Sequence, residues 1–204
     1  MGSVIVITSG KGGTGKTSLT GGVGASLALL GKQVLCLDGD VGLRNLDITL
    51  GMTDAALMDF SDVMAGRCDL SRAAVPHPTV SGLHLLTAPL TLPGDFPGEA
   101  GFQALLQQAR EAYDYVLIDS PAGLGPGFRL AVCGADRAIV VAVSDPSSLR
   151  DAQRVVTQLS QLETIHLVVN RVRPRLLRRQ NTTIDDAMDT AGLPLLGLVP
   201  EDPK

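Results

Sequence analysis

The chain has 204 residues, of which 45% are hydrophobic, and its 17 basic and 21 acidic residues give a net charge of −4 at pH 7. This composition suits one globular domain, residues 1–204, and the charge excludes a global positive field that would draw the protein onto nucleic acid. Three cysteines without a CxxC pair indicate reduced thiols, and no run of about 18 apolar residues is present to span a bilayer, so we expect a cytoplasmic protein.

Short, continuously apolar runs alternate along the chain with longer segments of helical pattern. The runs predict strands over residues 4–8, 33–38, 83–88, 115–119, 138–143, 166–170 and 195–200. The segments between them predict helices over residues 16–30, 57–65, 98–112, 125–133, 147–161 and 183–190. This alternation is typical of an α/β fold with a single doubly wound, mainly parallel sheet and helices on both faces, which binds ligands at the carboxyl ends of its strands.

The first predicted strand is followed by GKGGTGKT, residues 10–17, which fits the spacing G-x-x-x-x-G-K-[ST] of a phosphate-binding loop. Glycines let the backbone turn several N–H groups towards one anion, and the following helix directs its positive dipole end to the same point. We expect Lys16 to neutralise the β- and γ-phosphates of a nucleotide and Thr17 to supply a hydroxyl to Mg²⁺. The expected nucleotide contacts in this loop are Gly12, Gly13, Thr14, Gly15, Lys16, Thr17 and Ser18.

Carboxylates follow two of the other predicted strands. Asp38 and Asp40 lie two residues apart, on one face of an extended chain, and such a pair of like charges is costly unless a cation is near. A helix cap or a turn acid is the alternative for either of them. Asp119 ends the run YVLID, where a buried acid can hold Mg²⁺ through water. We therefore expect Thr17, Asp38 and Asp119 to form the metal site.

The phosphate loop contains a second lysine, Lys11, which the loop chemistry does not require. A solvated surface charge is the simplest interpretation of such a residue. The string KGGTGKT, however, resembles the deviant Walker A motif of the ParA/MinD family of ATPases. The resemblance implies that Lys11 reaches across a dimer to the phosphates of the partner's nucleotide.

Other segments occur in the order expected of the MinD branch of that family, namely LDGDVGLRNLD, LIDSPAG, SDPSSLRDAQRV and VPED. The resemblance implies a P-loop ATPase that binds ATP and Mg²⁺, forms a homodimer on ATP binding, acts in division-site placement and has MinC- and MinE-like partners. It assigns catalysis to Lys11, Lys16 and Asp40, with Asp40 orienting the attacking water, and makes Asp38 an outer Mg²⁺ partner. The alternatives are a ParA-like ATPase for DNA partition or cargo positioning, and a metabolic enzyme that uses the loop for phosphoryl transfer.

Adenine is expected where the last two strands end, at Asn170, Arg171, Pro200 and Asp202, because ligands of such sheets lie at the carboxyl edge and because family members bind it there. A strand-end turn is the alternative. The arginine run over residues 171–179 indicates a solvated face, or a contact with an anionic surface or a partner protein. We do not expect nucleic acid as a ligand. MinD chains continue past VPED to an amphipathic helix that binds the inner membrane peripherally, and we expect this sequence to lack that helix.

Overall fold

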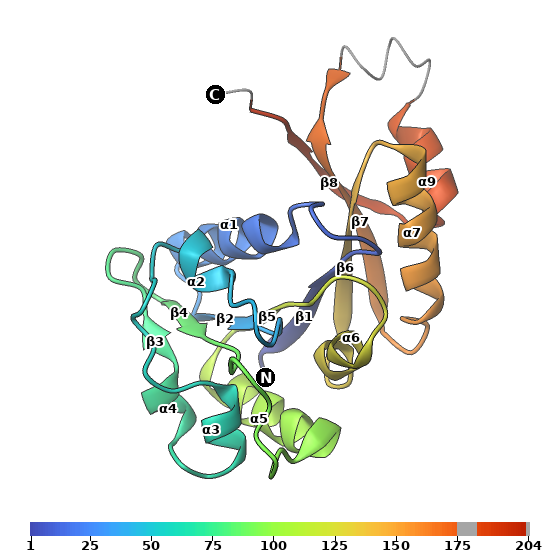
Figure 1. Ribbon diagram of the computed structural model, residues 1–204. Coiled ribbons are helices and arrows are strands. Elements are labelled where there is room, and N and C mark those ends of the chain that lie inside the picture. Colours follow the sequence, from blue (N-terminus) through green and yellow to red (C-terminus); the bar gives the residue numbers. More distant parts are fainter. Residues whose placement is uncertain (175–182, 203–204) are drawn as a thin grey trace.

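The computed structural model describes residues 1–174 and 183–202, and its described strands form one eight-stranded sheet (Figure 1). The strand order is β3-β4-β2-β5-β1-β6-β7-β8, and all neighbours pair in parallel except β3 and β4. The strands are β1 (Ser3–Thr8), β2 (Val34–Asp38), β3 (Val75–Pro76), β4 (Leu83–Leu86), β5 (Tyr115–Asp119), β6 (Arg137–Val143), β7 (Thr164–Val172) and β8 (Leu195–Pro200). The predicted doubly wound, mainly parallel sheet is thereby confirmed, with β1 at its centre.

Helices cover both faces of this sheet (Figure 1). They are α1 (Lys16–Leu29), α2 (Leu46–Thr49), α3 (Phe60–Met64), α4 (Leu70–Ala73), α5 (Gly98–Ala112), α6 (Pro126–Val132), α7 (Pro146–Thr157) and α9 (Ile184–Ala191). Buried residues of α1 and α2 join the apolar cluster on one face, whereas those of α5, α6, α7 and α9 join the cluster on the other. In the described part of the chain, no helix is long and apolar enough to cross a membrane.

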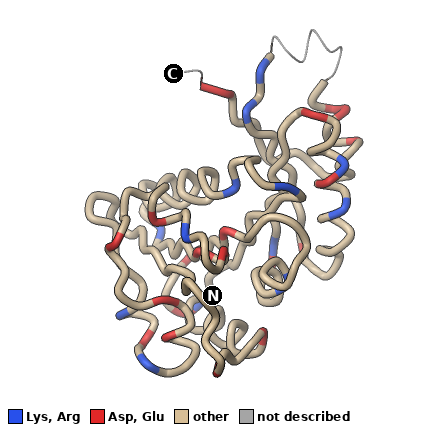
Figure 2. Tube along the Cα trace, in the orientation of Figure 1, with Lys and Arg blue, Asp and Glu red and all other residues tan. Residues whose placement is uncertain are grey.

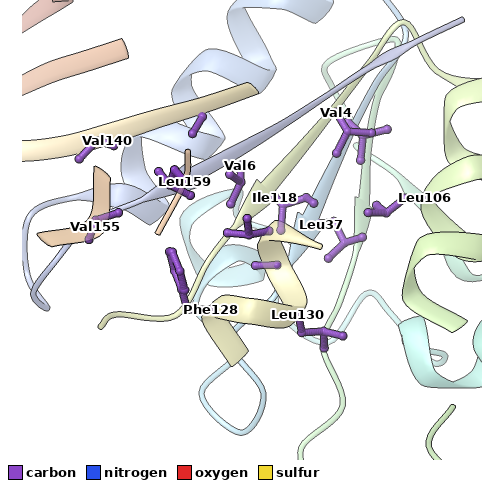
Figure 3. Close-up of a cluster of buried hydrophobic side chains, with 14 of the residues drawn as sticks. Val4, Val6, Leu37, Leu106, Ile118, Phe128, Leu130, Val140, Val155 and Leu159 are labelled. Atoms are coloured by element: carbon purple, nitrogen blue, oxygen red, sulfur yellow. The ribbon is translucent and has the colours of Figure 1, made fainter. Parts of the chain in front are cut away.

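Successive residues of the central strands bury their side chains on opposite faces. Val4 and Val6 of β1 belong to the cluster beneath α5, α6 and α7, part of which Figure 3 shows, and Ile7 belongs to the cluster beneath α1. Both sets are buried because each face has its own helical layer. This double burial explains why the strands are continuously apolar in sequence rather than alternating.

Some short elements and boundaries differ from the prediction. The pattern misses β3, α2 and α4, which are two or four residues long. The second predicted helix begins at Phe60 rather than at residue 57, because Asp59 and Asp62 form a capping box there. The helix expected from residue 147 begins at Pro146, where the Asp145 carboxylate accepts the Ser148 N–H as N-cap.

A partly buried ion pair attaches α5 to the amino-terminal edge of the sheet. Arg110 donates to both carboxylate oxygens of Asp136, at 2.5 and 2.7 Å, and the Val4 N–H donates to the same carboxylate at 2.9 Å. Burial acts to raise the pKa of Asp136, but the hydrogen bonds from Arg110 and Val4 outweigh it, and the net pKa lies below its usual value of 3.8. This clamp holds the start of the strand that leads into the phosphate loop.

Candidate nucleotide-binding site

The phosphate loop connects β1 directly to α1 at the carboxyl edge of the sheet. Gly13 and Gly15 adopt the left-handed conformations that the motif requires of glycine, with φ of 76° and 92°. Gly15 is the N-cap of α1, and neither a capping side chain nor an acidic residue occupies the first turn of that helix. The first N–H groups of α1 therefore lack a side-chain acceptor, as an anion-binding helix terminus requires.

Lys16 lies buried at the start of α1, with 8% of its surface exposed. Burial lowers the pKa of its ammonium, although the charges of Asp119 and Asp40 act in the opposite direction. Its ammonium forms no ion pair within residues 1–174 and 183–202. A buried cation without a direct counter-charge suits a polyanionic ligand.

Three carboxylates gather beside Lys16. Asp38 and Asp119 are direct register partners on the neighbouring strands β2 and β5, and both are almost fully buried. Burial, together with the charges of Asp38 and Asp40, raises the pKa of Asp119 to about 7, against the lowering effect of a Thr17 hydrogen bond and of Lys16. Burial also raises the pKa values of Asp38 and Asp40. The structure thus brings together the acids that the sequence assigned to one site.

Asp38 also closes the loop that follows β2. Its two carboxylate oxygens accept the N–H groups of Asp40, at 2.9 Å, and Leu46, at 3.1 Å. These bonds hold both ends of the segment, in which Arg44 has a left-handed φ of 45°. Asp38 therefore also positions Asp40. The sequence predicted Asp38 only as an outer Mg²⁺ partner.

Lys11 is held by its own chain, on the side of the loop facing α7. Its ammonium contacts both carboxylate oxygens of Asp145, at 3.1 and 3.2 Å, and the Ser147 hydroxyl, at 2.9 Å. The loop is seated tightly against this helix, because a Cβ at Gly10 would lie 2.4 Å from the Asp151 carbonyl oxygen. These partners of Lys11 were not among the residues predicted from the sequence. An Asp-Pro pair before a helical segment is an N-cap signal that would have located Asp145.

The residues expected around adenine lie at the ends of β7 and β8. A groove of about 430 Å³ is lined by Ser18 and Leu19 of α1, by Asn170 and by Val199, which precedes Pro200. The Asn170 amide is already bonded within the protein: its Nδ2 donates to the Thr14 carbonyl oxygen at 2.8 Å. The groove supports the expected place of the base, and base recognition by the individual residues stays a prediction.

Comparison with known proteins identifies the family. Residues 5–204 match the CobQ/CobB/MinD/ParA nucleotide binding domain. The chain is 41% identical over 207 residues to the septum site-determining protein MinD of Synechocystis sp., covering 100% of this chain and 78% of that protein. The chain belongs to the MinD family.

Solved structures of MinD proteins have the same fold. MinD in the MinC:MinD cell division protein complex of Aquifex aeolicus superposes with a TM-score of 0.91 at 39% identity, covering 99% of this chain and 82% of that one. The MinD of Pyrococcus horikoshii, solved as a complex with Mg-ADP, superposes with a TM-score of 0.84 at 31% identity, covering 100% and 83%. The fold that surrounds a nucleotide in that relative is thus the fold of this MinD-family chain.

The oxygen and nitrogen groups of this MinD-family site fit Mg²⁺ and a nucleoside triphosphate. Oxygen ligands suit Mg²⁺, which keeps several waters and binds proteins through one or two carboxylates and substrate phosphates. Thr17, Asp38 and Asp119 offer such oxygens. Burial raises the pKa values of the two acids, and a bound cation would offset this effect by stabilising their charged forms. Lys16 and the uncapped N-terminus of α1 provide the complementary charge for the phosphates.

Of the arginine run, the structure describes two members. Arg171 is exposed and has a left-handed φ of 52°, and Arg173 forms an ion pair with Glu201 at the end of β8. Arg175, Arg178 and Arg179 lie outside the described residues. Asp202 is exposed beside Glu201.

Proposed function

We propose that this protein is an ATP-dependent, dimerising switch ATPase of the MinD type, which acts in division-site placement and hydrolyses ATP to ADP and phosphate. The observation that carries the proposal is the phosphate loop with two lysines in different environments. Lys16 is buried beside the three carboxylates, whereas Lys11 points to α7 and is one-third exposed. The 41% identity to a septum site-determining relative over the whole chain favours this function over DNA partition.

Within one subunit, the loop binds and neutralises the triphosphate. The N–H groups of the loop and of the first turn of α1 donate to phosphate oxygens, and Lys16 balances charge on the β- and γ-phosphates. Thr17 would hold Mg²⁺ through its hydroxyl, and Asp119 and Asp38 would hold it through water. When bound, Mg²⁺ stabilises the negative charge that develops on the phosphate oxygens.

Asp40 is the residue placed to orient the attacking water. Asp40 follows the end of β2 by two residues, and its backbone N–H donates to the Asp38 carboxylate. Its carboxylate lies near enough to Lys16 for each charge to affect the other's pKa. The phosphate-loop and strand-end motifs contain neither a histidine nor a glutamate suited to strong general-base catalysis. Hydrolysis then depends on positioning and charge neutralisation, so it is slow without a partner.

Dimerisation completes the site through Lys11. In a single chain the Lys11 ammonium is paired with Asp145 and Ser147, so it reaches a second nucleotide only by exchanging these partners for phosphate oxygens. A phosphate oxygen cluster is a stronger counter-charge than one half-exposed carboxylate. ATP-dependent closure of two subunits is therefore coupled to release of this ion pair.

The test is Lys11→Ala, with Arg67→Gln as a matched control that removes another surface ion pair, Arg67 with Asp62. Light scattering should show that the parent and the control dimerise with Mg·ATP and stay monomeric with ADP. Lys11→Ala should bind ATP yet stay monomeric and lose nearly all hydrolysis. A Lys11→Ala protein that dimerises and hydrolyses ATP like the parent would refute the proposal.

We further propose MinC- and MinE-like partners, a cytoplasmic location with peripheral association with the inner membrane, and a single domain over residues 1–204. Partner binding is supported by the Aquifex MinC:MinD complex, and the single domain by the one continuous sheet. Co-sedimentation with the MinC protein of the same organism, in ATP but not in ADP, tests the first of these. Membrane fractionation of the native protein tests the second.

No described feature favours nucleic acid as the partner. Figure 2 shows basic positions interspersed with acidic ones along the described trace, rather than gathered on one extended face. Of the arginines after β7, Arg173 is neutralised by Glu201. Retention on nonspecific DNA at low salt, dependent on ATP, would be the observation that restores the partition alternative.

A further inference from the structure

One side-chain amide ties the phosphate loop to the end of β7. Asn170 Nδ2 donates to the Thr14 carbonyl oxygen at 2.8 Å, and Asn170 Oδ1 accepts the Arg171 N–H at 2.8 Å. The two bonds define the orientation of the amide group, since a carbonyl needs a donor and an N–H needs an acceptor. Asn170 is 8% exposed, and its bond to the Thr14 carbonyl is buried, whereas its bond to Arg171 is partly buried. The bond to Thr14 joins residues 156 positions apart in the chain.

The residues next to this amide have little freedom to change. A Cβ on Gly15 would lie 2.2 Å from Asn170 Nδ2, so the amide occupies the space that any other side chain at position 15 would need. Arg171, which donates to Asn170, holds a φ of 52°, uncommon for a residue with a side chain. Thr14 is 1% exposed and its hydroxyl has no partner among the described residues, so its side chain offers the loop no alternative anchor.

Because of peptide geometry, the bond between Asn170 and the Thr14 carbonyl also fixes the direction of the next N–H in the phosphate loop. The described chain has no cis peptide bonds, and in a trans peptide the C=O of one residue and the N–H of the next point in opposite directions. A Thr14 carbonyl directed out to Asn170 therefore directs the Gly15 N–H into the loop. The backbone N–H groups of such loops cradle the α- and β-phosphates.

We propose that Asn170 is a positioning residue of the nucleotide site, which holds the Thr14 carbonyl and thereby aims the Gly15 N–H at the β-phosphate. The proposal rests on the proposed function, because it takes the loop to bind a nucleotide. Its consequence is that Asn170 sets the affinity for the polyphosphate whatever base is attached. A residue that recognised adenine would instead discriminate ATP from GTP.

The experiment uses Asn170→Ala and Asn170→Asp. The Asp variant keeps the size and the acceptor for Arg171 but cannot donate to the Thr14 carbonyl when ionised. Calorimetry with the Mg²⁺ complexes of ATP, GTP and inorganic tripolyphosphate gives Kd values, and steady-state assays give KM and kcat for ATP. The control is Gln103→Ala, which removes an amide-to-carbonyl bond of 2.7 Å between α5 and Cys133 at the end of α6.

Both Asn170 variants should bind all three ligands about ten- to a hundredfold more weakly, with an unchanged ratio of ATP to GTP affinity and a KM that rises more than kcat falls. The control should match the parent. A loss confined to ATP, with tripolyphosphate bound as by the parent, would overturn positioning in favour of base recognition, and parental affinities would overturn it outright. If Asn170→Ala does not fold, Asn170→Asp decides by the same ratios. A parent protein that binds none of the ligands refutes the proposed function itself.

Discussion

Replacing Asp145 by Asn tests whether the Lys11 ion pair opposes dimerisation. Asn is as good an N-cap as Asp, so the bond to the Ser148 N–H and the start of α7 should be retained, while the charge that holds Lys11 is removed. The two side chains are 34% and 44% exposed, and an ion pair exposed to that extent contributes about 0.2–1 kcal/mol. A symmetric dimer releases two such pairs, which amounts to about 0.4–2 kcal/mol, or a two- to thirtyfold higher dimerisation constant.

Sedimentation equilibrium with Mg²⁺ and a non-hydrolysable ATP analogue measures that constant without turnover. The gain of Asp145→Asn over the parent should shrink as salt is raised, because salt screens exposed charges. Arg67→Gln removes a surface ion pair remote from the loop and should leave the constant unchanged. An Asp145→Asn protein that dimerises no more tightly than the parent at low salt would show that Lys11 gives up nothing when the subunits close.

Three further outcomes follow from charges that are buried or partly buried. Lys16→Met should lower ATP affinity at least tenfold in calorimetry while leaving the nucleotide-free melting temperature unchanged or raised, since the buried ammonium has no direct ion-pair partner in the described chain. Asp136→Asn should cost about 2 kcal/mol in urea unfolding at pH 7; because the folded pKa of Asp136 is depressed, this difference should persist down to about pH 4 and vanish as the pH falls through the folded pKa. Because the pKa of Asp119 is raised to about 7, the nucleotide-free fold loses stability as the pH rises from about 4 to 7. Mg·ADP should therefore raise the melting temperature of the parent more at pH 8 than at pH 6. This difference between the two pH values should be smaller in Asp119→Asn.

The elements with strong local patterns were predictable from the sequence. The strand expected over residues 115–119 and the helix expected over residues 98–112 occur as β5 (Tyr115–Asp119) and α5 (Gly98–Ala112). A strand buried on both faces is continuously apolar, and an amphipathic helix repeats its apolar face, so each carries its own signal. The two residues of β3 and the four of α2 are too few for a period, and their conformation depends on what they pack against.

The site was predictable in its location but not in its contacts. Motif spacing placed the loop, and the rule for parallel sheets placed Asp38, Asp119 and Asn170 at the same edge. The bonds from Lys11 to Asp145 and from Asn170 to Thr14 join residues 134 and 156 positions apart. Nothing local marks such a pairing, because Asp145 and Asn170 lie far along the chain from the loop and come near it only when the sheet order sets β6 next to β1 and β7 next to β6.

These two contacts divide the phosphate loop into a releasable part and a fixed part. The tie at Lys11 is charged and partly exposed, so water and salt weaken it and a phosphate can replace it. The tie at Thr14 is neutral and buried, so breaking it leaves a carbonyl and an amide unpaired in the interior. A loop that must keep its own nucleotide while sending one lysine to another needs both kinds of attachment. β6 and β7, adjacent in the sheet, supply one each: the turn after β6 holds the lysine that the proposed dimer would release, and the end of β7 holds the Thr14 carbonyl.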